Sequence, residues 1–321
     1  MSLRFVTLKV LGALATLAFV ITFNFFLFRI VEGDPVANLF RGRNLSQSQR
    51  AELQKQFGLD GSTGTQFVRY VEQTAQLNLG RSYSTNQSVA SEIWDKAGPT
   101  IALVGFSTLL STVFGVLLGI AAAWRRRTKT DYGVTTFTMA TYSMPDFWLG
   151  MLLLTGLAVG LGLFPVGGIT DPNSDATGLA KLADQAKHMV LPALTLTLAY
   201  LGEYALVMRT SLLETMREDY LVLARAKGLR DILVRNRHAV PNALLPTITL
   251  VFLNIGFVVS GAITVETVFS WPGLGLLSYE AIRGPDVPLL QAIFLLFSLA
   301  VVVANIVADV VVAAVDPRVR T

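Results

Sequence analysis

Residues 219–241 read DYLVLARAKGLRDILVRNRHAVP and lie between two long apolar stretches of the chain. The segment is too polar to span a bilayer, which needs roughly 20 apolar residues, and too long for a tight turn. Asp219 can cap a helix at its N-terminus, and Gly228 can end that helix. On a helical wheel, residues 220–227 are apolar in almost every direction. A helix that is apolar all round is buried, so a protein surface must cover this one.

Two protein surfaces could cover this helix: a separate partner, or the chain's own spans. Ala224 and Ala226 keep the helix narrow, so that a partner backbone could approach it. Residues 229–240 have a different pattern, which predicts an ordinary amphipathic helix lying along the membrane or along the bundle. Pro241 then interrupts the helical hydrogen bonds before the next apolar stretch. The apolar stripe of this second helix consists of Leu229, Ile232 and Leu233.

The composition places the chain in a membrane. Of its 321 residues, 52% are hydrophobic and only 15% are charged, whereas soluble domains contain about 25% charged residues. The chain has no cysteine and only two histidines, which excludes thiolate metal sites and histidine clusters, so we expect no metal site. The net charge of +4 does not indicate nucleic-acid binding, because no basic run contains interleaved aromatic residues.

Six stretches are long and apolar enough to span a bilayer. The first is better explained as an uncleaved anchor than as a signal peptide, because no small-x-small cleavage site follows it. We place the spans at about 8–28, 100–124, within 134–164, and at about 189–208, 243–265 and 287–315.

Lysine and arginine residues near the span ends predict the orientation. Basic residues are dense in RRRTK (125–129), in the 209–242 connection and in the terminal DPRVRT, whereas the 165–188 and 266–286 connections hold few. The sequence therefore predicts an all-α integral membrane protein with six transmembrane helices and both termini in the cytoplasm. We divide it into an N-terminal transmembrane helix (1–28), a large helical extracytoplasmic loop (29–99) and a core with five transmembrane helices (100–321), which includes a cytoplasmic loop at 209–242.

The extracytoplasmic loop contains two helical patterns. SQSQRAELQKQFG (46–58) has serine caps at its start and ends at a glycine. TQFVRYVEQTAQLNLG (65–80) places Phe67 and Tyr70 at helical spacing and ends at Gly80. We expect two short amphipathic helices packed on the outer membrane face; the alternative is a solvated linker.

Polar residues at membrane depth are candidates for the pore. Glu203 lies in the middle of the fourth span, and Asn305 and Asp309 share a face of the last one. The alternatives are a polar partner across the bundle for Glu203 and an interface role for the other two. Met144-Pro145 should kink the third span, since proline removes a backbone donor.

The stretch WPGLG (271–275) predicts a turn at the outer face. Trp271 suits an interface anchor, while Pro272, Gly273 and Gly275 suit a re-entrant turn with a possible gating role. His188, at the outer end of the fourth span, is interpreted as a contact at the start of a helix.

The cytoplasmic segment resembles the signature of the integral-membrane permeases of ABC importers. In that signature Glu-Ala-Ala, three residues, Gly and nine further residues precede Ile-x-Leu-Pro. Here Gly228 is followed by nine residues and HAVP (His238–Pro241), but Val222-Leu223-Ala224 replaces Glu-Ala-Ala. The variant ARAKG (224–228) is typical of the dipeptide/oligopeptide/nickel subgroup.

Further motifs resemble the B-type permease of that subgroup along the whole chain. The large loop after the first span is also typical of the B-type subunit. The motifs are GDPVANL (33–39), LNLGRSY (77–83), SMPDFWLG (143–150), HMVLPALTL (188–196), VETVFSWPGLG (265–275), NIVAD (305–309) and DPRVR (316–320).

The resemblance implies that 219–228 is the coupling helix, which docks in a cleft on a cytoplasmic ATPase. That ATPase must be a separate chain, because this sequence has no Gly-Lys pair and hence no P-loop. The implied coupling residues are Asp219, Tyr220, Leu223, Ala224, Arg225, Ala226, Lys227, Gly228, His238 and Pro241.

The same resemblance implies a non-catalytic pore subunit of an ATP-driven importer for di- or oligopeptides in a prokaryotic inner membrane. Its expected partners are a homologous C-type permease, two cytoplasmic P-loop ATPase subunits and an extracytoplasmic substrate-binding protein. No cofactor is expected on this chain, with ATP and Mg²⁺ held by the ATPases. Glu203 could then meet the ammonium group of a peptide. The alternatives are nickel or another small solute as substrate, a stand-alone secondary transporter or channel, and a membrane anchor or receptor without transport.

Overall fold

The computed structural model describes residues 3–32, 48–49, 52, 60–284 and 286–315 of the chain. Within these ranges the protein is helical, apart from an isolated bridge between Arg81 and Ser88, which confirms the predicted all-α class. The helix predicted at 46–58 and the motif GDPVANL (33–39) lie outside the described residues.

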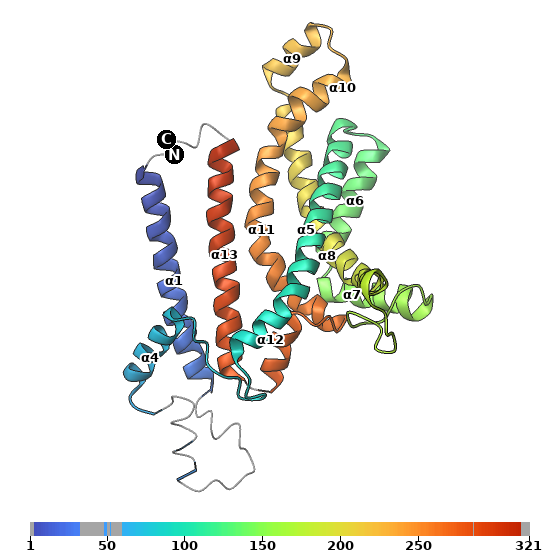
Figure 1. Cartoon of the computed structure of the whole chain (residues 1–321). Helices are drawn as coiled ribbons and strands as arrows, with labels where there is room; N and C mark the ends of the chain where they lie inside the picture. Colours follow the sequence, from blue (N-terminus) through green and yellow to red (C-terminus); the bar gives the residue numbers. More distant parts are fainter. Residues whose placement is uncertain (1–2, 33–47, 50–51, 53–59, 285, 316–321) are drawn as a thin grey trace.

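Four helices of the described chain are long and apolar enough to cross a membrane. A fifth long helix, α11 (Val240–Val268), coincides with the fifth predicted span and runs beside α8 and α13 (Figure 1). Six spans and cytoplasmic termini remain a prediction. The four helices are α1 (Leu3–Glu32), α5 (Val89–Trp124), α8 (Gly178–Thr215) and α13 (Val287–Val315).

The third predicted span is not one straight helix. It is divided into α6 (Lys129–Ser143) and α7 (Asp146–Leu153), the latter continued by a π-helical segment, η1 (Leu154–Gly160), and the two parts are bent by 104°. Met144 is extended, with ψ at 135°, because the residue before a proline avoids the helical region. The predicted kink at Met144-Pro145 is therefore a full break. With 15 residues, α6 is about 22 Å long.

The central contact of the bundle is the crossing of α5 and α8. Gly115 and Gly119, one turn apart on α5, lie directly against the backbone of α8. A Cβ atom added to Gly119 would lie 2.6 Å from the carbonyl oxygen of Ala205, and one added to Gly115 would lie 2.8 Å from that of Leu201. Small residues at this spacing allow two membrane helices to approach closely.

The second helix predicted in the loop after the first span is present as α4 (Thr63–Ala75), and it packs against α1, a contact that the sequence did not predict. Ser62 caps it, with its Oγ accepting a hydrogen bond from the amide of Thr65 at 3.3 Å. The ring centroids of Phe67 and Tyr70 lie 5.3 and 5.5 Å from that of Phe25 on α1. The helix ends at Ala75 rather than at the predicted Gly80.

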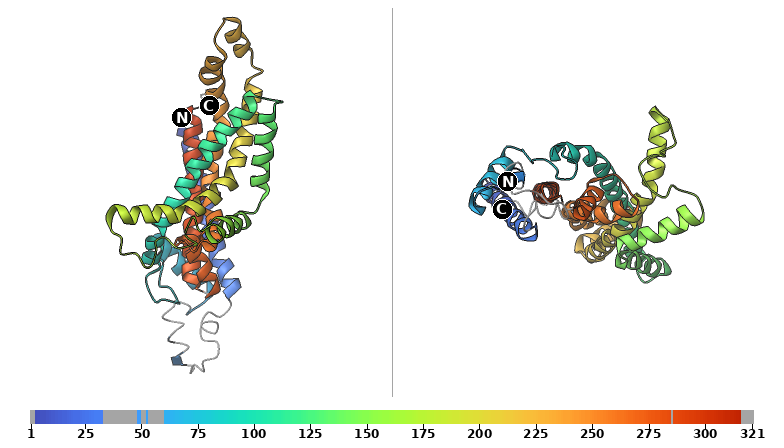
Figure 2. Two further views of the ribbon diagram at one scale, coloured as in Figure 1. Left: turned by 90° about the vertical axis from the view of Figure 1, so that its right-hand side faces the viewer. Right: turned by 90° about the horizontal axis from the view of Figure 1, so that it is seen from below.

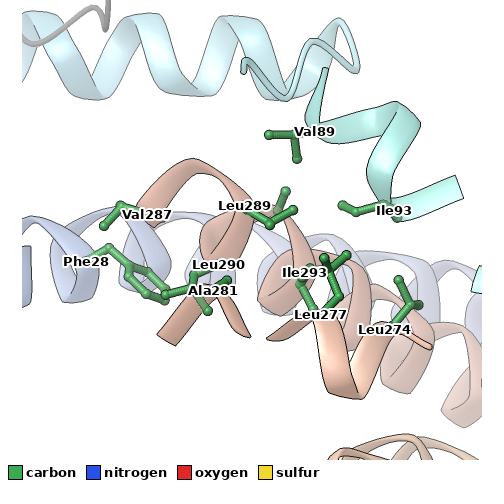
Figure 3. Packing of buried hydrophobic residues seen from close by; sticks show 11 residues of the cluster. Phe28, Val89, Ile93, Leu274, Leu277, Ala281, Val287, Leu289, Leu290 and Ile293 are labelled. Carbon is green, nitrogen blue, oxygen red and sulfur yellow. The ribbon is translucent and has the colours of Figure 1, made fainter. Parts of the chain in front are cut away.

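An apolar cluster joins α1, α5, α12 (Leu274–Arg283) and α13, as Figure 3 shows. Beside it, the buried carboxylate of Asp286 accepts hydrogen bonds from Ser82 Oγ at 2.5 Å and Ser84 Oγ at 2.8 Å. The segment around residue 82 is thereby anchored to the start of α13.

The described start of α1 and the described end of α13 lie at the same end of the bundle (Figure 1). At that end α9 (Asp219–Ala226) and α10 (Asp231–Leu233) project beyond all the other helices. The two side views, Figure 1 and the left panel of Figure 2, show this. Part of the segment 219–241 therefore forms a tip that extends beyond the bundle.

Candidate functional site

The projecting helix α9 has a defined start and end. Its N-cap is Glu218 rather than the predicted Asp219, and no side chain caps it. At the other end Gly228 adopts a left-handed conformation with φ +76°. The amides of Gly228 and Leu229 bond to the carbonyl oxygens of Arg225 and Ala224 at 2.9 and 3.4 Å, which is the Schellman pattern of helix termination. Gly228 thus ends the helix, as predicted.

The two faces of α9 have different surroundings. Leu221 and Ala224, with exposed fractions of 0% and 8%, pack on the ends of the chain's own helices. Val222 and Leu223 are 58% and 56% exposed, and Tyr220 is 39% exposed. The chain's own helices therefore cover one face of α9 and leave the other face uncovered, and a cover by a separate partner remains a prediction for that second face.

The second part of the loop differs from its prediction. Instead of a regular amphipathic helix, the chain forms the three-residue α10 and a π-helical segment, η2 (Val234–Ala239). The apolar stripe does not pack on the bundle, since Val234 and Ala239 are the residues buried there, and its alternative place along the membrane remains a prediction. The stripe residues Leu229, Ile232 and Leu233 are 39%, 54% and 45% exposed.

We call the uncovered apolar residues of this tip the apolar knob. They come from both parts of the loop and stand outside the helical bundle (Figure 1). Exposed apolar residues scattered singly need no explanation, but a contiguous set on a projecting element marks an interaction site. The knob consists of Tyr220, Val222, Leu223, Leu229, Ile232 and Leu233.

Polar contacts hold the knob to the end of α5. Trp124 Nε1 donates to Asp231 Oδ2 at 2.8 Å, and the guanidinium of Arg225 lies 5.9 Å from the Trp124 ring. Arg225 Nε also lies 4.0 Å from Asp231 Oδ1. Arg225 therefore has an internal partner, whereas Ala226 and Lys227 are exposed at the end of α9.

Further contacts hold the knob to the start of α11. Asn242 Nδ2 donates both to the Tyr220 hydroxyl at 3.1 Å and to the carbonyl oxygen of His238 at 2.8 Å. Burial raises the pKa of Tyr220, so its hydroxyl stays protonated at physiological pH. Pro241 lies in the first turn of α11, where a missing amide is tolerated. His238 and Pro241 thus lie where α9 joins the fifth predicted span.

The predicted pore residues lie in different surroundings. Glu203 on α8 accepts a hydrogen bond from Asn254 Nδ2 on α11 at 2.6 Å, which is a polar partner across the bundle. Asp309 on α13 pairs with Lys9 on α1 at 2.6 Å. Asn305 is exposed on α13. The structure does not bring these three residues together into one site.

The outer turn contains a buried carboxylate that the sequence analysis missed. Glu266 is completely buried and accepts hydrogen bonds from Thr100 Oγ1 at 2.6 Å and from the amides of Gly275 and Leu276 at 2.7 and 3.1 Å. It therefore caps the start of α12. The sequence signal that could have revealed this carboxylate was a glutamate inside an apolar run, six positions before the proline of the Pro-Gly turn.

The predicted turn at WPGLG is present, but the predicted role of Trp271 as an interface anchor is wrong. Trp271 is 2% exposed, and its Nε1 donates to the carbonyl oxygen of Pro99 at 3.1 Å. Gly273 and Gly275 lie against Glu266: a Cβ atom added to Gly273 would lie 2.4 Å from its carboxylate, and one added to Gly275 would lie 2.9 Å from it. Pro272 lies inside the same turn, between α11 and α12.

His188 is not at the start of a helix, because α8 begins at Gly178. Its Nδ1 lies 2.9 Å from the carbonyl oxygen of Asp184, within the same helix. At the opposite end of α8, Arg209 forms two bonds to the buried Asp131 of α6, Nε to Oδ1 at 2.7 Å and Nη2 to Oδ2 at 3.1 Å. Such a paired geometry is the strongest form of this interaction and fixes α6 to α8.

A bundle of long apolar helices with a projecting apolar knob is the architecture of an integral-membrane protein. The family model described as "Binding-protein-dependent transport system inner membrane component" matches residues 115–321. The model of the corresponding N-terminal region matches residues 2–104. The chain belongs to this family, and so it is an inner-membrane permease component of a bacterial ABC import system.

Named relatives cover almost the whole chain. It is 36% identical over 325 residues to the "Di/tripeptide transport system permease protein DppB" of Pseudomonas aeruginosa, covering 97% of both chains. It is 36% identical over 319 residues to the "Glutathione transport system permease protein GsiC" of Salmonella paratyphi A, covering 99% of both chains. These relatives confirm the resemblance to the peptide/nickel subgroup.

The fold is similar to that of a solved transporter. A chain of the MetNI methionine ABC transporter, in an inward-facing conformation, matches with a TM-score of 0.58 and 17% sequence identity. The match covers 70% of this chain and 96% of that chain. The similarity supports the same arrangement of permease helices.

Proposed function

We propose that this chain forms half of the translocation pore of an ATP-driven peptide importer. Its apolar knob would lie on the cytoplasmic side of the membrane and dock on an ATPase subunit. The observation that carries the proposal is the exposure of Val222 and Leu223 on a projecting helix whose other face is packed. The names of the relatives support di- or oligopeptides as the substrate. Nickel or another small solute is the second candidate within the same subgroup.

The remaining parts of the transporter belong to other chains. Two P-loop ATPases would hold ATP and Mg²⁺, a homologous permease would complete the pore, and an extracytoplasmic binding protein would deliver the peptide. This chain would contain six spans with cytoplasmic termini and would have no catalytic role. A stand-alone channel or a receptor without transport would have no need of a docking helix.

The contacts of α9 support a route for the coupling. When ATP closes the two ATPases, a docked α9 moves with them. The Trp124–Asp231 hydrogen bond would transmit this motion to α5, and the Tyr220–Asn242 bond would transmit it to α11. The spans would then exchange between an inward and an outward opening, as a two-state element biased from a distance.

Substitution of Val222 by aspartate tests the docking. A charge placed in a desolvated protein contact has no partner there, so we expect the ATPase to be lost on purification and peptide uptake to fall by about tenfold or more. The measurement is co-purification of the ATPase with the permease, together with ATP-dependent uptake in vesicles. The control is Val68→Asp on α4, because Val68 is 55% exposed, similar to Val222, but lies on the opposite side of the molecule. Equal ATPase recovery with both variants would contradict the docking.

Substitution of Gly228 by leucine tests the geometry of the helix end. A non-glycine residue in a left-handed conformation is destabilised by about 1–2 kcal/mol, while a Cβ atom here meets no other atoms within 4 Å. We therefore expect normal membrane insertion but uptake uncoupled from ATP hydrolysis. Gly228→Asn should retain more coupling, since asparagine tolerates this conformation. The measurement is the number of peptides transported per ATP hydrolysed, and normal coupling in the leucine variant would exclude the proposed role.

A further inference from the structure

Three of the carboxylates in the helical bundle differ in how their charge is compensated. Asp131 is paired with the guanidinium of Arg209 through two bonds. Glu266 is surrounded by three hydrogen-bond donors. Glu203 receives a single hydrogen bond from the amide of Asn254, at 2.6 Å. Of the three, Glu203 is the one whose charge its own chain compensates least.

The hydrogen-bond partner of Glu203 is a buried side chain. Asn254 on α11 is 7% exposed, and its Nδ2 donates to Glu203 Oε2. Within the part of the chain that the structure describes, Glu203 Oε1 has no hydrogen-bond partner. Asn254 therefore orients the carboxylate and leaves one oxygen for another group.

A buried hydroxyl without a hydrogen bond lies beside this pair. Tyr204 is completely buried, and its hydroxyl has no hydrogen-bond partner among the described residues. Asn254 and Thr112 lie close enough to interact with this hydroxyl, although neither forms a well-aligned hydrogen bond with it. A buried hydroxyl in this state is unfavourable, and water or a ligand atom would offset that cost.

Glu203 lies at the edge of the contact between α8 and α11, where the side of α8 that carries it is partly exposed. Gly202 contacts α6, and Ala205 contacts α5. One turn further along the side that carries Glu203, Leu206 is 39% exposed and Thr210 is also exposed. A carboxylate facing lipid at membrane depth is expensive, so this side must face a water-filled path or another protein chain.

The negative potential extends along the same helix toward the outer side. The hydroxyl of Tyr200, one turn before Tyr204, lies close enough to the carboxylates of Asp146 and Glu203 to interact with both charges. Asp146 Oδ2 also accepts a hydrogen bond from Thr264 on α11 at 2.9 Å. A cation that moves along α8 would meet two carboxylates in succession.

We propose that Glu203, held by Asn254 beside the Tyr204 hydroxyl, is a binding station for the ammonium group of the peptide in the middle of the translocation path. The inference rests on the proposed function, since it needs a pore along this side of α8. The ammonium group would bond to the unpaired oxygen of Glu203, and the Tyr204 hydroxyl would receive a partner from the same group or its water shell.

The test compares Glu203→Gln with the native protein in the full transporter, reconstituted in vesicles with its binding protein. Glutamine keeps the shape and a hydrogen bond to Asn254 but has no charge. With labelled alanyl-alanine as the probe, we expect the maximal rate of ATP-dependent uptake to fall by about tenfold. This is the effect expected from the loss of one charge-assisted hydrogen bond to the ammonium group. Glu203→Asp should recover part of the rate.

A second readout separates a pore role from a structural one. The unfolding temperature of the assembled complex and the recovery of both permease subunits should be the same for Glu203→Gln as for the native protein. Native uptake by Glu203→Gln would overturn the proposal, and so would a loss of subunit pairing, which would place the carboxylate at the contact between permeases. If the native complex showed no ATP-dependent uptake of any peptide, the proposed function itself would fail.

Discussion

Replacement of Gly119 by leucine is expected to prevent recovery of folded protein from the membrane. A Cβ atom alone at this position would lie 2.6 Å from the carbonyl oxygen of Ala205 and 2.8 Å from the Cβ of Met208. The oxygen belongs to the backbone of α8, and the Cβ atom is attached directly to that backbone. Neither atom can therefore move aside without separating α5 from α8. We expect destabilisation of about 3 kcal/mol or more, at the upper end of overpacking effects. The measurement is the yield of monodisperse protein in detergent and its unfolding temperature.

Gly105→Leu is the matched control for this prediction. Gly105 lies on the same helix, and a Cβ atom added there meets nothing within 4 Å. The two substitutions change helix propensity and hydrophobicity equally, so they differ only in what the new side chain meets. A similar yield for both variants would show that the close crossing of α5 and α8 does not stabilise the fold.

Replacement of Glu266 by alanine is expected to have the second largest effect. The substitution removes the acceptor of the Thr100 hydroxyl and of the amides of Gly275 and Leu276, and it leaves a cavity in a completely buried place. Each buried donor left without a partner is unfavourable by about 1–3 kcal/mol, so we expect a total loss of about 3 kcal/mol or more. The start of α12 should become mobile, which thermal unfolding and hydrogen exchange of residues 273–283 would detect.

Two variants sharpen this test. Glu280→Ala removes an exposed glutamate from α12 itself and should leave stability within about 0.5 kcal/mol of the native protein. Gly273→Ala should reproduce much of the effect of the Glu266 substitution, because its Cβ would lie 2.3 Å from Thr100 Oγ1 and 2.4 Å from the Glu266 carboxylate. If Glu266→Ala unfolded at the native temperature, the carboxylate would not hold the outer turn together.

Local sequence patterns predicted the features whose causes are local. The apolar stretches marked the long helices, since the need for about 20 apolar residues is a property of each segment alone. Gly228 marked the end of α9 because few other residues adopt its left-handed conformation. The periodicity of Phe67 and Tyr70 located the outer helix α4 and the face that contacts α1.

The features that the sequence did not predict depend on partners that are distant in the chain. Glu266 and Thr100 are 166 residues apart, and no periodicity relates them. Asp286 and Ser82 are 204 residues apart. The spacing of Gly115 and Gly119 was a usable signal for a close helix crossing, although it could not identify α8 as the partner.

The exposed stripe of Leu229, Ile232 and Leu233 shows a different limit. Helical periodicity indicates that one face of a segment needs a cover, but it does not indicate which molecule supplies that cover. We assigned the stripe to the membrane or the bundle, whereas the chain leaves it exposed at the end of the molecule. The same ambiguity was visible for α9, where the sequence left both covers open.

The pairing of α1 with α13 has a consequence for how the chain is made. Lys9 on α1 forms an ion pair with Asp309 on α13 at 2.6 Å, and Asn24 Nδ2 donates to the carbonyl oxygen of Gln291 at 2.8 Å. The ribosome synthesises α1 first and α13 last among the described helices. At about 5–20 residues per second, α1 waits in the bilayer for roughly 12–50 s before its neighbour exists. The first and last helices can therefore pair only after the rest of the bundle has been made, and a nascent chain that stops before α13 cannot form these two contacts of α1.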